Sequence, residues 1–295
     1  MKFIVVGLGS IGKRHKNNLE SLGHQVIPCH RNDDLNKLLN QEKTDAALIC
    51  NPTSLHIAKA LMAAESGVNI FIEKPVSHNL DQVDKLLKLV KKKKLTLMVG
   101  YNLRWQSGLR QIKEQLDKKA IGKVYSVRIE AGSLLADWHP NEDHRQSYSA
   151  KRNLGGGVLL DLSHEIDYAV WFFGKAKKVT ALLKNISELE IETEALAELT
   201  VEFESGIVAS IHLDYLRKEY KRSCEIIGSQ GQLRWNYIGT GPTDIDETYV
   251  REIENFIQAI KGKEKPLVTG EEAKHVLEIV EAAKKSSKTG GIVKL

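Results

Sequence analysis

Residues 3–15, "FIVVGLGSIGKRH", decide the fold of the first half of this chain. An apolar run from Phe3 to Val6 leads into glycines at positions 7, 9 and 12, which follow the spacing G-x-G-x-x-G. The apolar run is typical of a buried strand, and the segment that follows has the pattern of a helix. A strand, a glycine-rich turn and a helix in this order predict the first βα unit of a parallel sheet.

The same alternation continues through the first hundred residues. Apolar strands are predicted at 24–29, 45–50, 68–73 and 95–101, and helices at 11–23, 54–67 and 80–94. Strands that are apolar throughout are typical of a parallel sheet with helices on both faces. Right-handed crossovers then give a doubly wound α/β domain of the Rossmann type, which we predict to span residues 1–122.

After residue 122 the pattern changes to longer strands of alternating character, joined by short turns. Such strands are predicted at 123–133, 178–185, 195–204, 206–215, 220–229 and 231–237, and they indicate a mostly antiparallel sheet. One long helix from Gly157 to about Phe173 interrupts them, and two helices, at about 247–261 and 271–287, end the chain. Residues 123–295 are therefore predicted to form a second, α+β domain.

The composition argues against several classes of protein. Of the 295 residues, 42% are hydrophobic and 27% charged, and the net charge is only +5. Lysines 91–94 lie near a predicted helix end, where the helix dipole favours basic residues, so no nucleic-acid partner is expected. The three cysteines form no C-x-x-C pair, which predicts neither a disulfide nor a metal site. Without a signal peptide or an apolar run of about 20 residues, the protein is expected to be cytoplasmic and independent of membranes.

The glycine spacing also predicts a dinucleotide site. Gly7 allows a tight turn, Gly9 lets the backbone approach a pyrophosphate, and Gly12 allows the helix to pack closely. Ser10 and Ile11 lie at the start of the helix, whose N-terminus attracts phosphate. The alternative is a glycine turn with a purely structural role.

The end of the second strand bears on the choice of cofactor. His30 and Arg31 stand where NAD-binding proteins usually carry an acid for the ribose hydroxyls. A cation suits the 2′-phosphate of NADP, so NADP is favoured over NAD. The alternative is that Arg31 is a surface residue beside a helix that begins near Asp33.

Two further segments carry candidate chemistry. "EKP", residues 73–75, ends the fourth strand, at the edge of the sheet where such folds bind ligands. There Lys74 can exchange a proton near a nicotinamide, although a strand-end lysine is often only an ion-pair partner. "LGGGVLLDLSHEID", residues 154–167, carries Asp161, His164 and Asp167 three residues apart, within one broad face of a helix.

Taken together, these segments resemble the Gfo/Idh/MocA family of oxidoreductases. The resemblance rests on "GLGSIGKRH", "NPTSLH", "FIEKP", "GYNLRW", "AIGKV" and "GGGVLLDLSHEID", in the family's order over nearly the whole chain. It implies NAD(P)-dependent hydride transfer at a hydroxyl or keto carbon of a sugar, nucleotide-sugar or cyclitol. It also implies that the second domain is an open sheet through which members associate as homodimers or homotetramers.

The family's functional residues carry over by position. Lys74 matches the EKP lysine, and His164 matches the catalytic histidine. The resemblance further implies that these residues line the cofactor: Asn51, Pro52, Thr53, His56, Glu73 and Asn102. The family's aspartate stands four residues before the histidine, whereas Asp161 stands three before it. Asp161 therefore either orients His164 from another angle or is displaced by a local change in the helix, and Asp167 is expected to be structural.

The segment 136–157, "ADWHPNEDHRQSYSAKRNLGGG", resembles a sub-branch with a D-W-x-P and S-Y-S-A signature. It suggests a wall for the substrate. The residues expected to form that wall, together with Lys74 and His164, are Arg104, Trp138, Arg145, Tyr148 and Lys151. The basic residues among them suit a carboxylate or phosphate on the substrate, with surface charges as the alternative.

The predicted mechanism is direct hydride transfer, in which His164 or Lys74 exchanges the hydroxyl proton and the other polarises the oxygen. One alternative is a hydrolase or lyase that cycles a tightly bound NAD. A second alternative is a sensor that binds the dinucleotide without catalysis, although such a sensor has no need of Lys74 or His164.

Overall fold

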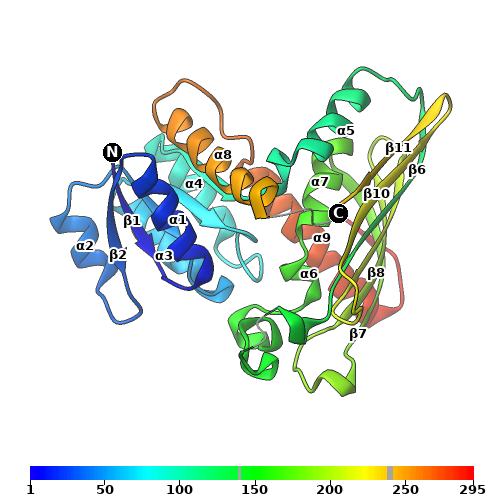
Figure 1. The fold of residues 1–295 in the computed structure, drawn as a ribbon, viewed down its shortest axis with the longest axis horizontal. Coiled ribbons are helices and arrows are strands. Elements are labelled where there is room, and N and C mark those ends of the chain that lie inside the picture. Colours follow the sequence, from blue (N-terminus) through cyan, green and yellow to red (C-terminus); the bar gives the residue numbers. More distant parts are fainter. Residues whose placement is uncertain (139–140, 238–241) are drawn as a thin grey trace. The chain divides into compact units, whose positions relative to one another are not determined.

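The computed structural model describes residues 1–138, 141–237 and 242–295 (Figure 1). Within these ranges the chain forms two compact units. Unit 1 combines Met1–Asn102 with Thr243–Lys274, and unit 2 combines Leu103–Pro242 with His275–Leu295. A segment near the C-terminus therefore packs within the N-terminal unit.

In the described part of the chain, unit 1 is built on five parallel strands in the order β2-β1-β3-β4-β5. The strands are β1 (Lys2–Val6), β2 (Gln25–Cys29), β3 (Ala46–Ile49), β4 (Asn69–Glu73) and β5 (Leu97–Gly100). β3 and β5 are buried along their whole length. This burial explains their continuous apolar sequences and confirms the predicted doubly wound sheet.

The helices predicted after the first, third and fourth strands of unit 1 are present, and α2 (Leu35–Gln41), which was not predicted, follows the second. Besides α2, the helices of this unit are α1 (Ser10–Ser21), the 3₁₀ turn η1 (Thr53–Leu55), α3 (His56–Glu65), α4 (Val83–Lys93) and α8 (Pro242–Ile260). α1 contacts β1 and β2, whereas α2 and α4 both contact α3. The Arg14 guanidinium of α1 lies 4.8 Å from the ring centre of Tyr249 on α8, and the rings of Phe71 and Phe256 are 5.6 Å apart. These contacts explain why α8 belongs to unit 1.

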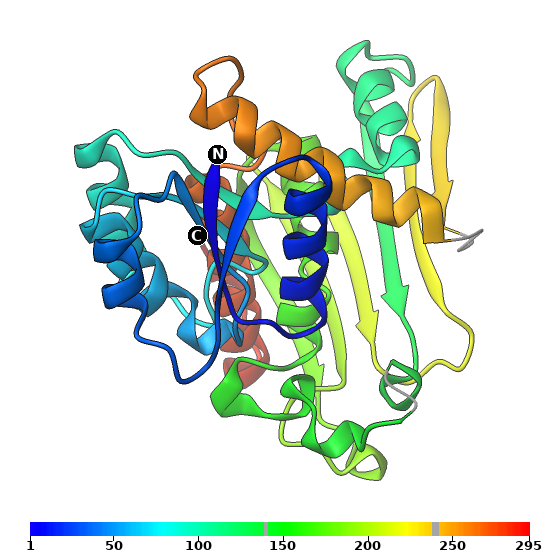
Figure 2. The same cartoon turned by 60° about the vertical axis from the view of Figure 1, so that its left-hand side comes forward.

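Unit 2 is built on a sheet whose described strands follow the order β11-β10-β6-β9-β8-β7-β12 (Figure 2). They are β6 (Val124–Gly132), β7 (Ala176–Lys184), β8 (Leu196–Phe203), β9 (Val208–Asp214), β10 (Lys221–Gly228), β11 (Gly231–Asn236) and β12 (Val293–Lys294). β6 and β9 pair in parallel, and the other neighbouring strands are antiparallel. The predicted mostly antiparallel sheet is confirmed.

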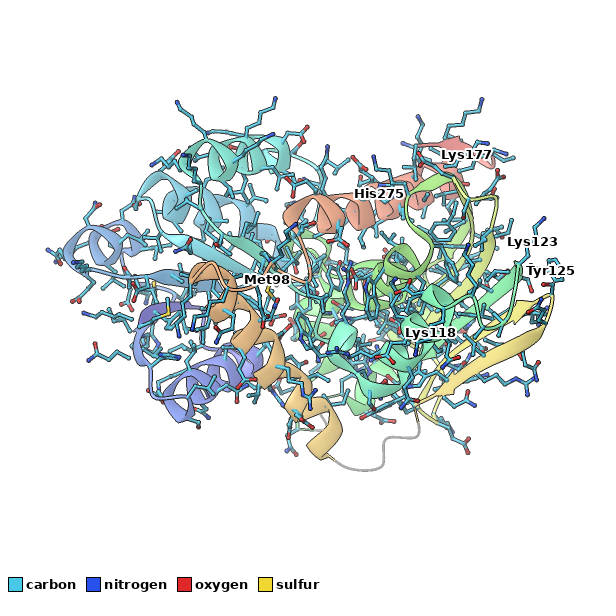
Figure 3. All side chains as sticks on the ribbon, turned by 90° about the horizontal axis from the view of Figure 1, so that it is seen from above. Met98, Lys118, Lys123, Tyr125, Lys177 and His275 are labelled. Carbon is cyan, nitrogen blue, oxygen red and sulfur yellow. The ribbon has the colours of Figure 1, made fainter. Side chains whose placement is uncertain are left out.

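Helices cover one face of this sheet (Figure 1). They are α5 (Ser107–Asp117), α6 (Val158–Asp161), α7 (His164–Phe173) and the part of α9 (Gly270–Thr289) that begins at His275. α6 and α7 contact β9, and the side chains of β8 alternate between buried and more exposed. His275, labelled in Figure 3, accepts the Ala176 N–H at 2.8 Å and so ties α9 to β7.

Short 3₁₀ turns lead from β5 and β6 into these helices. They are η2 (Asn102–Trp105), η3 (Leu135–Asp137), η4 (His144–Gln146), η5 (Tyr148–Ala150) and η6 (Arg152–Leu154), and η7 (Ser187–Leu189) follows β7. His139 and Pro140, which belong to the predicted D-W-x-P signature, lie outside the described residues.

The single helix predicted from Gly157 to Phe173 is wrong in one respect. Two residues, Leu162 and Ser163, separate α6 from α7, and Leu162 has φ −98° and ψ 30°. The sequence is apolar and helical in pattern across this break, so its periodicity gives no sign of it. The break falls between Asp161 and His164.

The fold class predicted from the sequence is confirmed in both units. The boundary at residue 122 stays a prediction, because the compact units divide the chain by packing and assign α8 to unit 1. Among the described helices, none is both long and apolar enough to cross a bilayer.

Candidate active site

The glycine-rich turn lies between β1 and α1. Gly7 has φ +89°, and a Cβ atom there would lie 2.8 Å from the backbone N and Cα of Asn51. A Cβ on Gly12 would collide with the Gly7 carbonyl oxygen, whereas a Cβ on Gly9 would meet nothing within 4 Å. Gly7 and Gly12 are therefore required by the protein's own packing, and the space around Gly9 is open for a ligand.

The start of α1 suits a phosphate. Gly9 is its N-cap, no side chain among the described residues caps it, and its first turn carries no acid. Its first N–H groups thus point away from the helix without an intrahelical partner. Such a terminus, preceded by an open glycine, is a ready site for the pyrophosphate of a dinucleotide.

The acids after β2 are engaged locally. Asp33 accepts the His30 N–H at 2.7 Å, and Asp34 caps α2 by accepting the Lys37 N–H at 3.2 Å. His30 and Arg31 are both exposed. The cationic side chain of Arg31 therefore stands at the strand end, ahead of carboxylates that are already hydrogen-bonded.

The loop after β3 contains two kinds of residue. Asn51 and Pro52 reach the surface, whereas Thr53 and His56 are buried. The ring nitrogens of His56 lie 2.9 Å from the Pro75 carbonyl oxygen and 2.8 Å from that of Asn51. Burial lowers the pKa of His56. His56 thus ties the β3 loop to the turn after Lys74, which disfavours its predicted direct contact with the cofactor.

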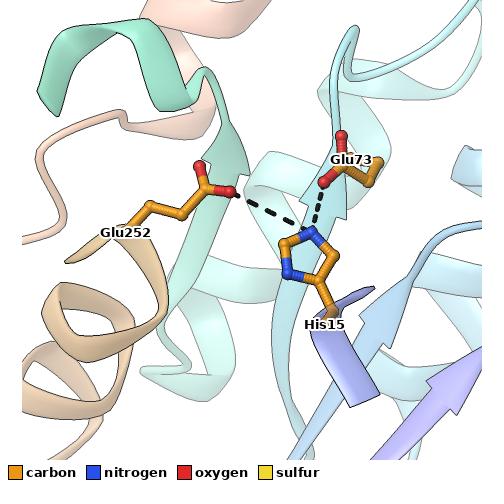
Figure 4. Close-up of side chains that lie close together, drawn as sticks. All are labelled: His15, Glu73 and Glu252. Carbon is orange, nitrogen blue, oxygen red and sulfur yellow. Dashed lines mark hydrogen bonds and ion pairs between the residues drawn. The ribbon is translucent and has the colours of Figure 1, made fainter. Parts of the chain in front are cut away.

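Lys74 follows β4 and is half-buried. Its backbone N–H donates to Oε2 of Glu73 at 3.2 Å, and Oε1 of Glu73 lies 2.5 Å from Nε2 of His15 (Figure 4). Both oxygens of Glu73 are therefore hydrogen-bonded within the protein. Asn102, also predicted beside the cofactor, is buried and donates to Oγ1 of Thr248 on α8 at 2.7 Å. These contacts give Glu73 and Asn102 roles in fixing the sheet edge rather than free ligand groups.

Glu252 of α8 joins His15 and Glu73 in a buried cluster (Figure 4). Within the described ranges this is the only group of three acid, histidine or cysteine residues whose ligand atoms all lie within 4.8 Å of one another. Two ligands of one zinc ion, each about 2.1 Å from it, are roughly 3 Å or more apart. The 2.5 Å separation of His15 and Glu73 is instead that of a hydrogen bond.

In the glycine triplet 155–157 of unit 2, two glycines leave space that backbone and side-chain atoms of the protein itself occupy. A Cβ on Gly156 would collide with the carbonyl oxygens of Tyr148 and Ser149. Gly157 has φ +116°, and a Cβ there would collide with the carboxylate of Glu194. That carboxylate accepts the Leu159 N–H at 3.3 Å, at the start of α6. The glycines therefore let Glu194 cap α6, and burial raises the pKa of Glu194.

Asp161 ends α6 beneath aromatic side chains. Its Oδ2 accepts the hydroxyl of Tyr215 at 2.5 Å, and its Oδ1 accepts the hydroxyl of Tyr148. The rings of Tyr215 and Trp138 meet edge to face at 5.3 Å, and the indole N–H of Trp138 donates to Ser133 Oγ at 2.6 Å. Trp138, Tyr148 and Asp161, predicted separately from the sequence, are thus brought together in unit 2.

His164 opens α7 directly after the helix break and is 7% exposed. The shortened spacing between Asp161 and His164 therefore coincides with a local change in the helix. Of the two alternatives that the sequence left open, this geometry favours the second. The catalytic roles of both residues stay predictions.

The basic residues expected at the substrate wall are engaged elsewhere. Arg104 is 1% exposed, and its Nε and Nη2 donate to the two carboxylate oxygens of Asp167 at 3.0 and 2.8 Å. Arg145 pairs with Asp143 and Glu190 at the surface, and Lys151 pairs with Glu192 at 3.1 Å. These pairings disfavour Arg104, Arg145 and Lys151 as substrate ligands and fit the structural role expected of Asp167.

Four residues of these clusters were missed in the sequence: His15, Glu194, Tyr215 and Glu252. Glu252 had a detectable signal, because it lies three residues after Tyr249 and four before Phe256 on the apolar face of an amphipathic helix. A carboxylate on such a face is unusual. Glu194 and Tyr215 belong to strand ends whose contacts with α6 only the fold brings about.

Comparison with known proteins decides the family. The profile for the oxidoreductase family with an NAD-binding Rossmann fold matches residues 24–101. The profile for the GFO/IDH/MocA C-terminal domain matches 109–234, and that for the family's C-terminal alpha/beta domain matches 242–295. The chain belongs to the Gfo/Idh/MocA family. This confirms the resemblance seen in the sequence and the prediction of an oxidoreductase with an NAD(P)-binding Rossmann domain.

Relatives within the Gfo/Idh/MocA family match along the whole chain. Myo-inositol 2-dehydrogenase of Thermotoga maritima is 28% identical over 341 aligned positions, which cover 100% of this chain and 98% of that protein. The scyllo-inositol 2-dehydrogenase (NAD(+)) of Bacillus subtilis is 24% identical, in an alignment that covers 99% of this chain and 95% of that protein.

Solved structures of the family share the fold. The WlbA dehydrogenase of Bordetella pertussis, in complex with NADH and UDP-GlcNAcA, superposes with a TM-score of 0.87 at 20% identity, covering 100% of this chain and 97% of that one. Scyllo-inositol dehydrogenase of Lactobacillus casei, with NAD(H) and scyllo-inositol, superposes with a TM-score of 0.83 at 20% identity, covering 100% and 98%.

Proposed function

We propose that this protein transfers a hydride between a nicotinamide cofactor and a hydroxyl or keto carbon of a cyclitol or sugar. The observation that carries the proposal is the placement of Lys74 within unit 1. It follows the C-terminal end of β4, and its backbone is fixed by Glu73, in the same sheet as the open glycine turn after β1. Ligands of doubly wound sheets bind at this edge. Full-length relatives named as inositol dehydrogenases support the substrate class.

The cofactor supplies the hydride, and the protein supplies position and proton management. We assign the pyrophosphate to the turn containing Gly7, Gly9, Ser10, Ile11 and Gly12, because the start of α1 is uncapped and Gly9 is open. Asn51 and Pro52 line the neighbouring loop. Hydrogen bonds of His56, Glu73 and Asn102 to other parts of unit 1 fix the segments that follow β3, β4 and β5.

Lys74 and His164 are the proposed acid–base groups. One takes the hydroxyl proton when the substrate is oxidised, or returns it during reduction, and the other polarises the oxygen. Asp161 is proposed to orient the side chains around it through the hydroxyls of Tyr148 and Tyr215. Trp138 and Tyr148 are the proposed substrate wall, because both are partly exposed. Tyr148 donates to Asp161, and Trp138 packs on Tyr215, the second donor to Asp161.

We further propose that NADP binds more tightly than NAD. Arg31 is exposed at the end of β2, and the two acids that follow it hydrogen-bond the local backbone. A guanidinium there can pair with a 2′-phosphate. Separate titrations with NADH and NADPH test this proposal. Tighter binding of NADPH, lost in Arg31→Ala, supports it, and a preference for NADH contradicts it.

The uncovered face of the unit 2 sheet supports self-association into a dimer or tetramer. Leu182, Glu198, His212 and Glu130 form one row across four neighbouring strands on this face. Leu182 is 51% exposed, and Ile227 on β10 is 41% exposed. Light scattering of the purified protein tests the proposal, with a monomer as the contradicting result. We also propose a domain boundary at residue 122 and a cytoplasmic location.

An assay of net cofactor reduction tests the main proposal. The protein is incubated with NAD⁺ or NADP⁺ and a panel of cyclitols, sugars and nucleotide-sugars, and the absorbance of the reduced nicotinamide is followed. Net reduction with one substrate supports the dehydrogenase. Turnover without net reduction would indicate a cycling hydrolase or lyase, and binding without turnover would indicate a sensor.

A further inference from the structure

The carboxyl group of Glu252 is buried without a hydrogen bond. The side chain is 0% exposed, and neither Oε1 nor Oε2 has a hydrogen-bond partner among the described residues. Its Oε1 lies 4.0 Å from Nε2 of His15, which in turn is 2.5 Å from Glu73 (Figure 4). An unpaired ionised carboxylate in such surroundings costs several kcal/mol of folding free energy, so a buried carboxyl without partners normally keeps its proton.

One neighbouring carboxylate, that of Glu73, acts on Glu252. Among the described residues, His15 on α1, Cys50 after β3 and Glu73 at the end of β4 act on Glu252 directly. Tyr249 on α8 contacts the His15 ring, and Lys74 follows Glu73 in the chain. Burial, and after it the charge of Glu73, raises the pKa of Glu252 well above its ordinary value. Loss of that proton would place a second carboxylate charge within 4.8 Å of the first.

The cluster of His15, Glu73 and Glu252 is connected to Lys74, the proposed acid–base group, by one hydrogen bond. His15 engages Oε1 of Glu73, and Oε2 of the same carboxylate accepts the backbone N–H of Lys74. A change of charge at Glu252 therefore acts on the group that fixes the Lys74 backbone. The three side chains come from α1, β4 and α8, so the cluster also joins the C-terminal helix of unit 1 to the glycine turn and to the strand that carries Lys74.

We propose that Glu252 is a positioning residue beside the His15–Glu73 pair: without a charge it leaves Glu73 on the Lys74 backbone N–H, and its ionisation sets the alkaline limit of turnover. The proposal rests on the proposed function of Lys74. Protonated Glu252 leaves a single carboxylate charge in the cluster. At alkaline pH the second charge repels Glu73, weakens its hold on the Lys74 N–H and lowers turnover.

The first test measures stability and needs no substrate. Between the ordinary pKa of glutamate and its raised value in the fold, the folded state binds more protons than the unfolded state, so stability falls as pH rises. Glu252→Gln cannot ionise. Its unfolding equilibrium should shift toward the folded state relative to the parent, by up to about tenfold for each pH unit above about 4.5. Glu254→Gln, exposed on the same helix, is the matched control and should follow the parent.

The second test measures turnover. The alkaline limb of kcat/KM should move upward by roughly one pH unit or more in Glu252→Gln. Glu252→Asp, which can still ionise, should keep an alkaline limb. A turnover profile that is identical in the parent, Glu252→Gln and Glu254→Gln overturns the proposal. A parent without turnover on any substrate refutes the proposed function instead, while the stability comparison still reports on Glu252.

Two measurements on the parent protein test the proposal even if the Glu252 variants fail to fold. Infrared spectroscopy near neutral pH should show the C=O band of a buried protonated carboxylic acid, which disappears at alkaline pH. Its absence overturns the proposal. Elemental analysis should find no divalent metal in stoichiometric amount. A bound metal that depends on Glu252 and His15 would also overturn it, because the cluster would then hold a cation in place of a proton.

Discussion

The hydroxyl of Tyr215 donates to Oδ2 of Asp161 at 2.5 Å, from the residue that follows β9 to the last residue of α6. Tyr148 donates to the other carboxylate oxygen, so two tyrosines hold one aspartate. This arrangement fixes the end of α6 immediately before the helix break and His164. Of these two donors, Tyr148 belongs to the predicted S-Y-S-A signature, whereas Tyr215 lies outside every predicted motif.

Tyr215→Phe removes one of these donors. Leaving a buried acceptor unsatisfied costs about 1–3 kcal/mol, so urea unfolding should show a loss of stability of this size. Tyr125→Phe is the matched control, because Tyr125 is 59% exposed on β6 (Figure 3). Equal stability of the two variants would show that the Tyr215–Asp161 hydrogen bond does not hold α6.

Substitutions at Gly9 and Gly12 in the first turn should have different effects, one on cofactor affinity and the other on stability. Gly9→Ala has open space, so its unfolding free energy should stay within about 0.5 kcal/mol of the parent, while dinucleotide affinity falls by about tenfold or more. Gly12→Ala forces a methyl group onto the Gly7 carbonyl oxygen and should cost about 1–3 kcal/mol of stability. Thermal unfolding and cofactor titration measure both effects. Undiminished affinity in Gly9→Ala would remove the pyrophosphate from this turn.

Neutralising the carboxylate of the buried Arg104–Asp167 ion pair should lower the free energy of unfolding far more than neutralising that of a surface pair. Asp167→Asn removes the carboxylate charge that pairs with the buried Arg104 guanidinium, and breaking a buried ion pair typically costs about 3–5 kcal/mol. The control is Asp117→Asn, at the exposed pair with Lys113, which should cost less than about 1 kcal/mol. Denaturant unfolding of both variants is the measurement, and similar losses would argue against a structural role for this pair.

Unit 2 should show a pH dependence that comes from His212 and Asp214. Although burial opposes it, hydrogen bonds from His212, the Leu216 N–H and Arg217 hold the pKa of Asp214 below its ordinary value. A hydrogen bond to Asp214 raises the pKa of His212. Asp214 thus contributes stability above pH about 4 that is lost as pH falls, and His212 contributes stability below pH about 6.5 that is lost as pH rises through its raised pKa.

His212→Gln therefore should remove the alkaline part of this dependence and leave the acid part in place. Asp214→Asn should reduce both the acid and the alkaline part of the pH dependence of stability. Free energies of unfolding, measured from acid to mildly alkaline pH, would show these profiles. A parent whose stability does not fall above pH about 6.5 relative to His212→Gln would contradict the assignment.

Much of the fold could be predicted because local pattern and tertiary packing agree. The apolar strands β3 and β5 are buried on both faces, as their sequences require, and the glycines at positions 7 and 12 meet backbone atoms that leave no room for a side chain. The sequence also predicts that Lys74 stands at a strand end of that sheet, and it directly follows β4. In each case, a short stretch of sequence contains the physical cause.

The rest depends on contacts between distant segments. The break between α6 and α7 lies in a sequence of continuous helical pattern, and Asp161 before it is held by Tyr215, fifty-four positions away. Arg104, predicted at the substrate wall, donates to Asp167, sixty-three positions away. Glu252 joins unit 1 only because α8 packs against α1. No local periodicity encodes these pairings.

The most direct test of the central claim is the turnover of Lys74→Ala, measured by net reduction of the nicotinamide with the best cyclitol or sugar. A positioned acid–base group contributes about 10²–10⁴-fold, so turnover should fall by a comparable factor while the dissociation constant of the cofactor stays nearly the same. Unchanged turnover in Lys74→Ala would contradict the account of hydride transfer at this sheet edge.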